Sequence, residues 1–239
     1  MVFTVENYCY PQYNTRNLHS GVDLVMTKNN ILIFGDSYST FAGYIPAGNA
    51  TYYSEKPRPE TDVTAVEQTW WHQVITEIKG KLILNDSWSG STIGYTGWNG
   101  ADNSASSSFI YRLRQLIDQN FFTENKIGTV FVFGGTNDSW SNAPLGQEMC
   151  DCWEEKDLYF VLPAIWYFLD LLKSTLPEAK IYCLINNELK DEVVSCIKNA
   201  CEKYEMTPIT FDHIDKNYGH PTIAGMKDIS DTVLKILNQ

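Results

Sequence analysis

The sequence predicts an α/β domain in which a parallel sheet of about five strands is covered by helices. Short apolar runs recur along the chain, and each is followed by a longer segment with apolar residues at helical spacing. Strand and helix patterns alternate five times, and the connections are long enough for right-handed crossovers between parallel strands. We therefore expect one doubly wound domain over residues 1–239, in which residues 1–30 form an irregular N-terminal extension.

The expected strands are short runs rich in aliphatic and aromatic residues, and they lie at 31–35, 81–85, 129–133, 180–185 and 207–211. Nearly unbroken apolar runs are typical of strands that are buried on both faces of a parallel sheet. The fifth run contains Pro208, which cannot donate to a ladder and is tolerated at a sheet edge. Helical spacing and end signals predict helices at 66–79, 105–120, 157–174, 188–204 and 221–237.

The overall charge argues against several classes of partner. The net charge is -11, whereas nucleic acids and anionic membranes need a basic surface. No apolar run reaches the roughly 18 residues of a membrane-spanning helix. The N-terminus lacks a basic region followed by an apolar core, so a cytoplasmic location is expected, although a leader already removed would leave secretion open. The oligomeric state stays open.

The sequence gives no reason to expect a metal or another cofactor. Its six cysteines have no framework spacing, and Cys150 and Cys152 have no second Cys/His pair at ligand spacing. A flavin- or nucleotide-binding protein is also disfavoured, because no phosphate-cradling Gly-rich loop follows the first strand.

Polar, turn-forming residues follow the carboxyl ends of three expected strands. These loops carry Ser37, Gly90 and Asn137, and His220 lies in the loop before the last helix. In a parallel sheet such loops open on the same edge, so distant residues can converge there. Serine needs an adjacent base to act as a nucleophile, and histidine is a suitable base near neutral pH. The Ser37 amide, the Gly90 amide and the Asn137 side chain are the available donors for an oxyanion.

Each of these residues also has a purely structural interpretation. Asp36 and Ser37 could cap the next helix, Gly90 could serve a turn with positive φ, and Asn137 follows two glycines in good turn chemistry. His220 could be a surface histidine, and His213, close to the fifth strand, is its main rival as the base.

The order of these residues resembles the SGNH (GDSL-type) hydrolase family. Gly35-Asp36-Ser37 is similar to its first block, Asn85-x-Ser87-x-x-Gly90 to its second, Gly135-x-Asn137-Asp138 to its third, and His220-Pro221 to its fifth. The resemblance implies a flavodoxin-like α/β/α sandwich, Ser37 as nucleophile, His220 as base, no metal, and hydrolysis of esters of lipids or acylated sugars. The absence of Gly-x-Ser-x-Gly argues against an α/β-hydrolase elbow.

The chain departs from the family pattern at one position. The family places an aspartate three residues before the histidine, where this chain has Asn217. Asp215 is the nearest carboxylate on the loop and is the favoured acid, with Asp212, Asn217 itself and a backbone carbonyl as alternatives. An amide or carbonyl orients an imidazole but supplies no full charge for the imidazolium.

Aromatic residues in the loops suggest the substrate. Trp88, Trp98 and Trp140, with Tyr95, lie in loops at the expected active edge and are candidates to stack on a sugar ring. We therefore expect a serine esterase that removes short acyl groups, above all O-acetyl groups from a small-molecule or oligosaccharide ester. The alternatives are a lipid acyl-ester hydrolase and a catalytically silent carbohydrate-binding relative. Part of these aromatics is expected in the core, where such side chains bury large areas.

Overall fold

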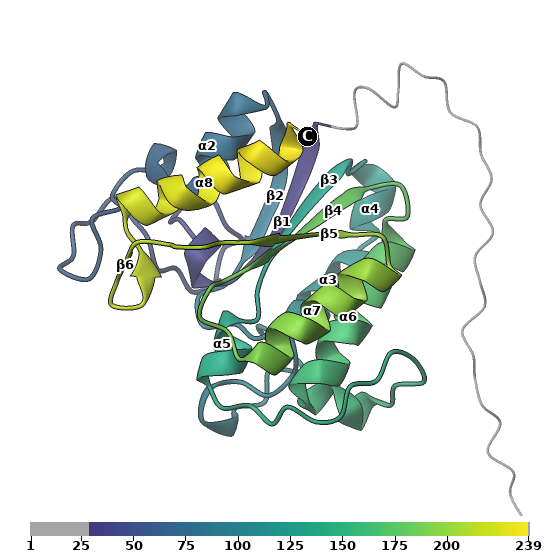
Figure 1. Cartoon of the computed structure of the whole chain (residues 1–239). Helices are drawn as coiled ribbons and strands as arrows, with labels where there is room; N and C mark the ends of the chain where they lie inside the picture. Colours follow the sequence, from purple (N-terminus) through teal and green to yellow (C-terminus); the bar gives the residue numbers. More distant parts are fainter. Residues whose placement is uncertain (1–28, 239) are drawn as a thin grey trace, which may run out of the picture.

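A parallel five-stranded sheet forms the centre of the molecule in a computed structural model that describes residues 29–238 (Figure 1). The strands are β1 (Asn30–Gly35), β2 (Lys81–Ser87), β3 (Thr129–Phe133), β4 (Lys180–Ile185) and β5 (Thr207–Thr210), in the order β2-β1-β3-β4-β5. All four neighbouring pairs are parallel. This order is that of the flavodoxin-like doubly wound sheet, so the predicted fold class is confirmed.

Helices connect the strands and cover both faces of the sheet (Figure 1). The α-helices are α2 (Trp70–Glu77), α3 (Phe109–Asp118), α4 (Phe121–Glu124), α5 (Thr136–Trp140), α6 (Val161–Thr175), α7 (Asp191–Lys203) and α8 (Ile223–Leu237). Short 3₁₀ helices lie at η1 (Ser37–Ser39), η2 (Val66–Gln68), η3 (Trp98–Gly100) and η4 (Glu155–Tyr159). A two-residue hairpin, β6 (Lys216–Asn217) and β7 (His220–Pro221), precedes α8.

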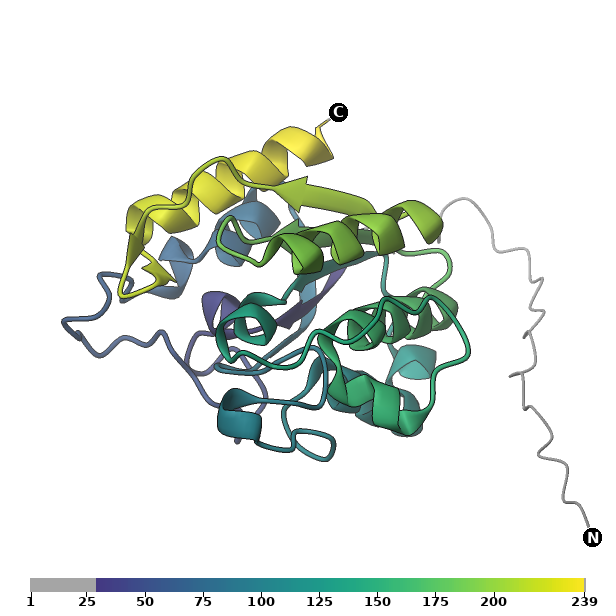
Figure 2. The same cartoon turned by 60° about the horizontal axis from the view of Figure 1, so that its bottom comes forward.

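Alternate residues of each strand enter two separate cores. In β1, Ile31 and Ile33 pack with α2 and α8 on one face, whereas Leu32 and Phe34 pack with α3, α6 and α7 on the other. All four are fully buried, as expected for a parallel strand covered on both faces. Figure 2 shows the sheet between these two helical layers.

The expected elements agree closely with those observed. The strands predicted at 129–133 and 180–185 have the same bounds in the structure, and Pro208 lies in β5, an edge strand. The predicted helices begin two to four residues later in the structure, and 3₁₀ turns precede α2 and α6. Asn137, which follows two glycines in good turn chemistry, lies in the short helix α5. Of the irregular extension predicted at 1–30, residues 1–28 lie outside the described residues, and so does Cys9.

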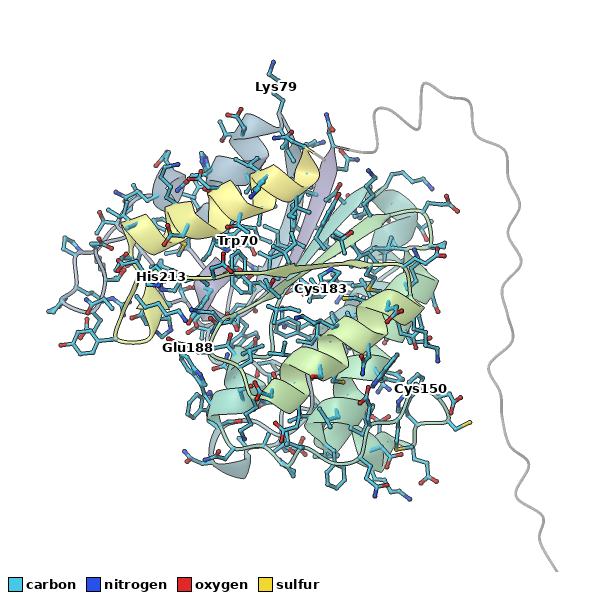
Figure 3. The ribbon with its side chains drawn as sticks, in the orientation of Figure 1. Trp70, Lys79, Cys150, Cys183, Glu188 and His213 are labelled. Carbon is cyan, nitrogen blue, oxygen red and sulfur yellow. The ribbon has the colours of Figure 1, made fainter. Side chains whose placement is uncertain are left out.

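The cysteines of the described segment have contrasting environments. Cys183, Cys196 and Cys201 are buried, whereas Cys150 and Cys152 are exposed. Figure 3 shows Cys183 within the molecule and Cys150 on a surface loop. Within residues 29–238, no cluster of three or more potential metal ligands occurs, and no helix has both the length and the apolarity needed to cross a bilayer.

Candidate active site

Ser37 lies directly beyond the carboxyl end of the central strand β1, in the first position of η1. Asp36 caps this turn, since its Oδ1 accepts a hydrogen bond from the Tyr38 amide at 3.0 Å. The capping interpretation therefore holds for Asp36, while Ser37 is left for another role. A side chain at Gly35 would collide with Ser87 Oγ at 2.3 Å, so glycine is needed where the strand ends pass each other.

The pKa of Asp36 is raised, although the residue also caps a turn. Its carboxyl group is fully buried, and burial raises its pKa to about 7, against the hydrogen bond from Tyr38, which lowers it. Repulsion from the Asp138 carboxylate is a smaller cause that also raises the pKa of Asp36. The carboxyl group that holds the turn carrying Ser37 is thus fully buried, with a raised pKa.

His220 lies at hydrogen-bond distance from Ser37. Its Nε2 is 3.0 Å from Ser37 Oγ, and its Nδ1 is 3.1 Å from the backbone oxygen of Tyr218. Because a carbonyl oxygen can only accept, Nδ1 carries the proton in the neutral ring and Nε2 presents its lone pair to the serine hydroxyl. Burial is the largest influence on the pKa of His220 and lowers it, so the ring is kept in its basic, neutral form.

The hairpin that carries His220 is anchored to several parts of the sheet edge. Tyr38 Oη donates to the Gly219 carbonyl at 2.6 Å, and Tyr53 Oη donates to the Pro221 carbonyl at 2.9 Å. The Lys216 ammonium pairs with Glu188 Oε2 at 2.9 Å; Glu188 is labelled in Figure 3, on the connection that follows β4. The imidazole is therefore fixed through the backbone on both sides.

Asp215 does not orient His220 in this structure. Its Oδ2 accepts a hydrogen bond from Thr222 Oγ1, and its amide donates to Asp228 Oδ2 at 3.2 Å. The expectation that Asp215 completes a triad is thus wrong for this geometry, because the carboxylate faces the first turn of α8. Among the alternatives, Asp212 is exposed and Asn217 Nδ2 donates to the Pro59 carbonyl at 3.3 Å. The group at Nδ1 is the backbone carbonyl of Tyr218.

His213, the rival histidine, is exposed on the connection after β5 (Figure 3). The position beside the serine hydroxyl is occupied by His220.

Two backbone amides beside the serine are available as donors. Among the hydrogen bonds of residues 29–238, neither the Ser37 amide nor the Gly90 amide has a partner. Gly90 has φ of +84°, so its turn interpretation holds as well. The neighbouring amides of Ser89 and Ser91 are occupied by the carbonyls of Ala50 and Trp88. The loop is therefore held in place while one of its amides stays available.

Asn137 is buried in α5 and its side-chain amide has a defined orientation. Nδ2 donates one proton to the Ser91 carbonyl at 2.9 Å, and Oδ1 accepts from the exposed indole of Trp98 at 3.0 Å. The second Nδ2 proton stays available as a donor. Trp98 therefore determines which end of the amide is oxygen and which is nitrogen.

Asp138, the neighbour of Asn137 in α5, connects this helix to the loop that follows β2. Its carboxylate accepts hydrogen bonds from the amides of Ile93 and Gly94 at 3.0–3.3 Å. Burial raises its pKa to about 6, against these hydrogen bonds.

The aromatic candidates divide into rim and core residues. Trp98 is 43% exposed, and Trp88 and Trp140 are half-buried. Trp140 lies beside the hairpin, since a Cβ at Gly219 would be 3.1 Å from its ring. Tyr95 is fully buried and its hydroxyl contacts Glu155, so it belongs to the core.

Residues that the sequence analysis did not single out also shape the site. Arg112 is buried, pairs with Asp86 at 3.1 Å and donates to the Gly35 carbonyl at 3.3 Å. Tyr52, from the long loop at 43–62, stacks on His220. The loop itself was predicted from its composition, but no spacing rule connects a residue in it to a histidine more than a hundred positions later.

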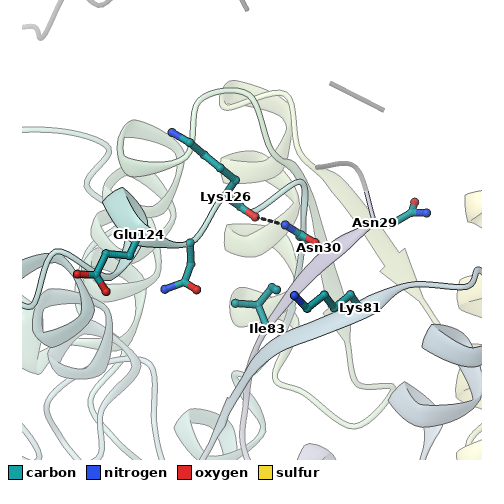
Figure 4. A pocket seen from close by; sticks show the side chains of 7 residues that line it. Asn29, Asn30, Lys81, Ile83, Glu124 and Lys126 are labelled. Atoms are coloured by element: carbon teal, nitrogen blue, oxygen red, sulfur yellow. Dashed lines mark hydrogen bonds between the residues drawn. The ribbon is translucent and has the colours of Figure 1, made fainter. Parts of the chain in front are cut away.

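A surface hollow at the amino ends of β1 and β2 is distant from these residues. It is lined by Asn29, Asn30, Lys81, Ile83, Glu124, Asn125 and Lys126 (Figure 4). It contains neither serine nor histidine, and it lies at the edge of the sheet opposite to Ser37.

A doubly wound parallel sheet with a serine and a histidine paired beyond its strand ends is typical of hydrolases that use a serine nucleophile. The GDSL-like lipase/acylhydrolase family model matches residues 29–237, and the chain belongs to this family of ester hydrolases. A search among curated proteins found no match.

Solved structures agree with this assignment. A protein from Bacteroides ovatus described as a GDSL-like lipase is 41% identical, with a TM-score of 0.81, and the match covers 88% of this chain and 98% of that one. A counterpart from Bacteroides uniformis has the same identity and TM-score, with 88% and 96% covered. An acetyl xylan esterase from Butyrivibrio proteoclasticus shares the fold, at 13% identity and a TM-score of 0.57, over 88% of this chain and 63% of that one.

Proposed function

We propose that this protein is a serine esterase that hydrolyses short acyl esters, above all O-acetyl groups on a carbohydrate, through Ser37 and His220. One observation carries the proposal: Ser37 Oγ is 3.0 Å from His220 Nε2, while Nδ1 donates to the Tyr218 carbonyl. A serine hydroxyl beside a correctly protonated imidazole is the arrangement that acyl transfer requires.

In the acylation step, Ser37 Oγ forms a bond to the ester carbonyl carbon. Its proton moves to His220 Nε2, and the carbonyl π electrons move to the carbonyl oxygen. The Ser37 amide, the Gly90 amide and Asn137 Nδ2 are the proposed donors to this oxyanion. The intermediate then re-forms the carbonyl and breaks the bond to the leaving oxygen, which takes the proton from Nε2. The acyl group stays on Ser37.

Deacylation repeats these events with water. The water oxygen bonds to the acyl carbon, its proton moves to His220 Nε2, and the Ser37 Oγ–carbon bond breaks. The serine oxygen recovers a proton from Nε2 and the carboxylic acid leaves. The same imidazole thus acts as base and then as acid in both halves.

The preference for an acetylated carbohydrate rests on the aromatic rim. Trp98 is 43% exposed while its indole N–H is engaged with Asn137, so its ring is presented next to a proposed oxyanion donor. Trp140 lies beside the hairpin of His220, and the 73% exposed Tyr218 is in the loop of that hairpin. Rigid aromatic faces at a site rim suit sugar rings better than a long flexible acyl chain. Similarity in fold to an acetyl xylan esterase is compatible with this preference.

The Ser37→Ala variant tests the reaction with p-nitrophenyl acetate. We expect a loss of kcat of at least about 10³-fold, because a hydroxyl nucleophile is removed. Ser174→Ala, on the exposed face of α6, is the matched control and should behave as the wild type. Ser37→Ala activity within a few-fold of wild type would end the proposal.

Two further measurements separate the alternatives. A series of p-nitrophenyl esters from acetate to dodecanoate should show the fastest turnover for acetate; a maximum at long chains would identify a lipid acyl-ester hydrolase instead. A fluorophosphonate probe should label Ser37 in the wild type. An unlabelled, folded protein would indicate a silent carbohydrate-binding relative.

A further inference from the structure

The imidazole of His220 lacks a carboxylate partner, yet one of its faces is covered by an aromatic ring. The Tyr52 and His220 rings are stacked, with centroids 3.6 Å apart and an interplanar angle of 7°. The Tyr218 carbonyl at Nδ1 and the Ser37 hydroxyl at Nε2 fix the hydrogen-bond directions in the plane of the ring, but neither contacts its faces. The parallel ring of Tyr52 contacts one of these faces.

Tyr52 is itself attached to the turn that carries the nucleophile. Its amide donates to Thr40 Oγ1 at 2.9 Å, and Thr40 Oγ1 donates to the Ser37 carbonyl at 3.0 Å. The Ser37 hydroxyl contacts His220 Nε2. Ser37, Thr40, Tyr52 and His220 are therefore connected in a closed series of contacts. The relative placement of serine and histidine is thus set through Tyr52 as well as through the hairpin.

The stacked ring of Tyr52 can also stabilise the positive charge that forms on His220. During acylation the imidazole becomes a cation, and in a serine–histidine–aspartate triad a buried carboxylate stabilises that cation. The face of a phenol ring carries negative electrostatic potential and attracts a cation lying over it. With a neutral carbonyl at Nδ1, the ring of Tyr52 is the group in contact that can respond to the new charge.

We propose that Tyr52 is the positioning residue that replaces the triad acid in this protein, by fixing the plane of the His220 ring and stabilising its cationic form. This inference rests on the proposed serine esterase function.

The charged groups around His220 disfavour its cationic form. Arg58 and Lys216 each oppose protonation of the ring, and no carboxylate is among the groups that influence its pKa. Arg58 lies over the Tyr52 ring, 4.7 Å from the centroid. The other polar neighbours of the imidazole are the Ser37 hydroxyl and Tyr38, whose ring centroid is 5.6 Å from the imidazole centroid. Burial lowers the pKa of His220 further.

Fluorinated phenylalanines at position 52 provide the test. The Tyr52→Phe variant keeps the ring and loses a long 3.5 Å hydrogen bond to the Glu60 carbonyl, so it is the reference against which kcat of the fluorinated series on p-nitrophenyl acetate is measured. Successive fluorines withdraw electron density from the face with little change in size. We expect kcat to fall stepwise, by about tenfold in total at three fluorines, as a cation–π contact of partly buried groups implies.

The pH profile supplies an independent readout. Loss of cation stabilisation lowers the pKa of His220, so the acid limb of kcat/KM should move to lower pH as fluorines are added. The same should hold for Tyr52→Leu. If the Tyr52 ring only packed against His220, neither kcat nor the pH of the acid limb would change in proportion to the number of fluorines.

A matched control exists elsewhere in the chain. Tyr167 is half-buried and has Arg114 over its ring at 5.0 Å, but it contacts neither Ser37 nor His220. Tyr167→Leu should leave the acid limb unchanged. The inference is overturned if kcat and the acid limb are independent of fluorination while Ser37→Ala is inactive. If Ser37→Ala is active, the proposed function itself fails, so the two failures are distinguishable.

Discussion

The Asp215→Ala variant separates two accounts of how His220 is oriented. In a triad the acid contacts Nδ1, and its removal lowers kcat by about 10⁴-fold. Here the Tyr218 carbonyl contacts Nδ1 and the Asp215 carboxylate contacts Thr222 Oγ1. We therefore expect Asp215→Ala to retain the wild-type catalytic efficiency to within about threefold, because the replaced group does not touch the imidazole.

The substitution should lower the free energy of unfolding rather than the catalytic efficiency. Thr222 caps α8, and its Oγ1 accepts from the Gly225 amide at 3.2 Å while donating to Asp215. Loss of one half-buried hydrogen bond to a carboxylate amounts to about 1–2 kcal/mol of the free energy of unfolding. For a chain of this size, that lowers the midpoint of thermal unfolding by roughly 2–8 °C.

Thermal unfolding followed by circular dichroism and steady-state kinetics on p-nitrophenyl acetate measure the two effects separately. Asp212→Ala, at an exposed aspartate on the same connection, is the control and should change neither. If folded Asp215→Ala protein lost about 10³-fold or more of its catalytic efficiency, as a triad acid would cause, the reasoning would be refuted. That result would mean that the carboxylate, and not the carbonyl of Tyr218, orients the working imidazole.

Two other substitutions test the loops around the site. Trp98→Phe removes the indole N–H that orients Asn137 Oδ1. Because the oxyanion donor is then less well oriented, we expect kcat for p-nitrophenyl acetate to fall by about fivefold to tenfold, with little change in KM. An unchanged kcat would show that the Ser91 carbonyl alone orients the amide. Tyr218 and Gly219 form the two-residue loop between β6 and β7, with φ of 46° and 75°. Because asparagine tolerates positive φ better than tyrosine does, Tyr218→Asn should stabilise the protein by about 0.5–1 kcal/mol in urea unfolding, and a lower stability would contradict the turn assignment.

Much of the fold could be predicted because its signals are local. Thr129–Phe133 and Lys180–Ile185 are nearly continuous apolar runs bounded by polar residues, and a strand buried on both faces needs that composition. Pro208 indicated an edge strand, because a proline cannot complete a ladder on both sides.

Other features depend on contacts between distant segments, which local patterns do not record. Residues 134–138 have good turn chemistry, yet Thr136–Trp140 forms a helix. Asp138 accepts from the amides of Ile93 and Gly94, which are more than forty residues away. Turn preference and helix capping use the same residue types, so composition alone could not decide between them.

By itself, the sequence determined the sheet, the order of its connections and the set of loops that meet at its carboxyl edge, because apolar periodicity and turn residues act over a few positions. Only the tertiary structure decided what faces the second nitrogen and the ring of His220. The Tyr218 carbonyl and the Tyr52 ring reach that imidazole because the hairpin and the long loop follow paths set by hydrogen bonds between remote segments. No spacing in a sequence records such distances.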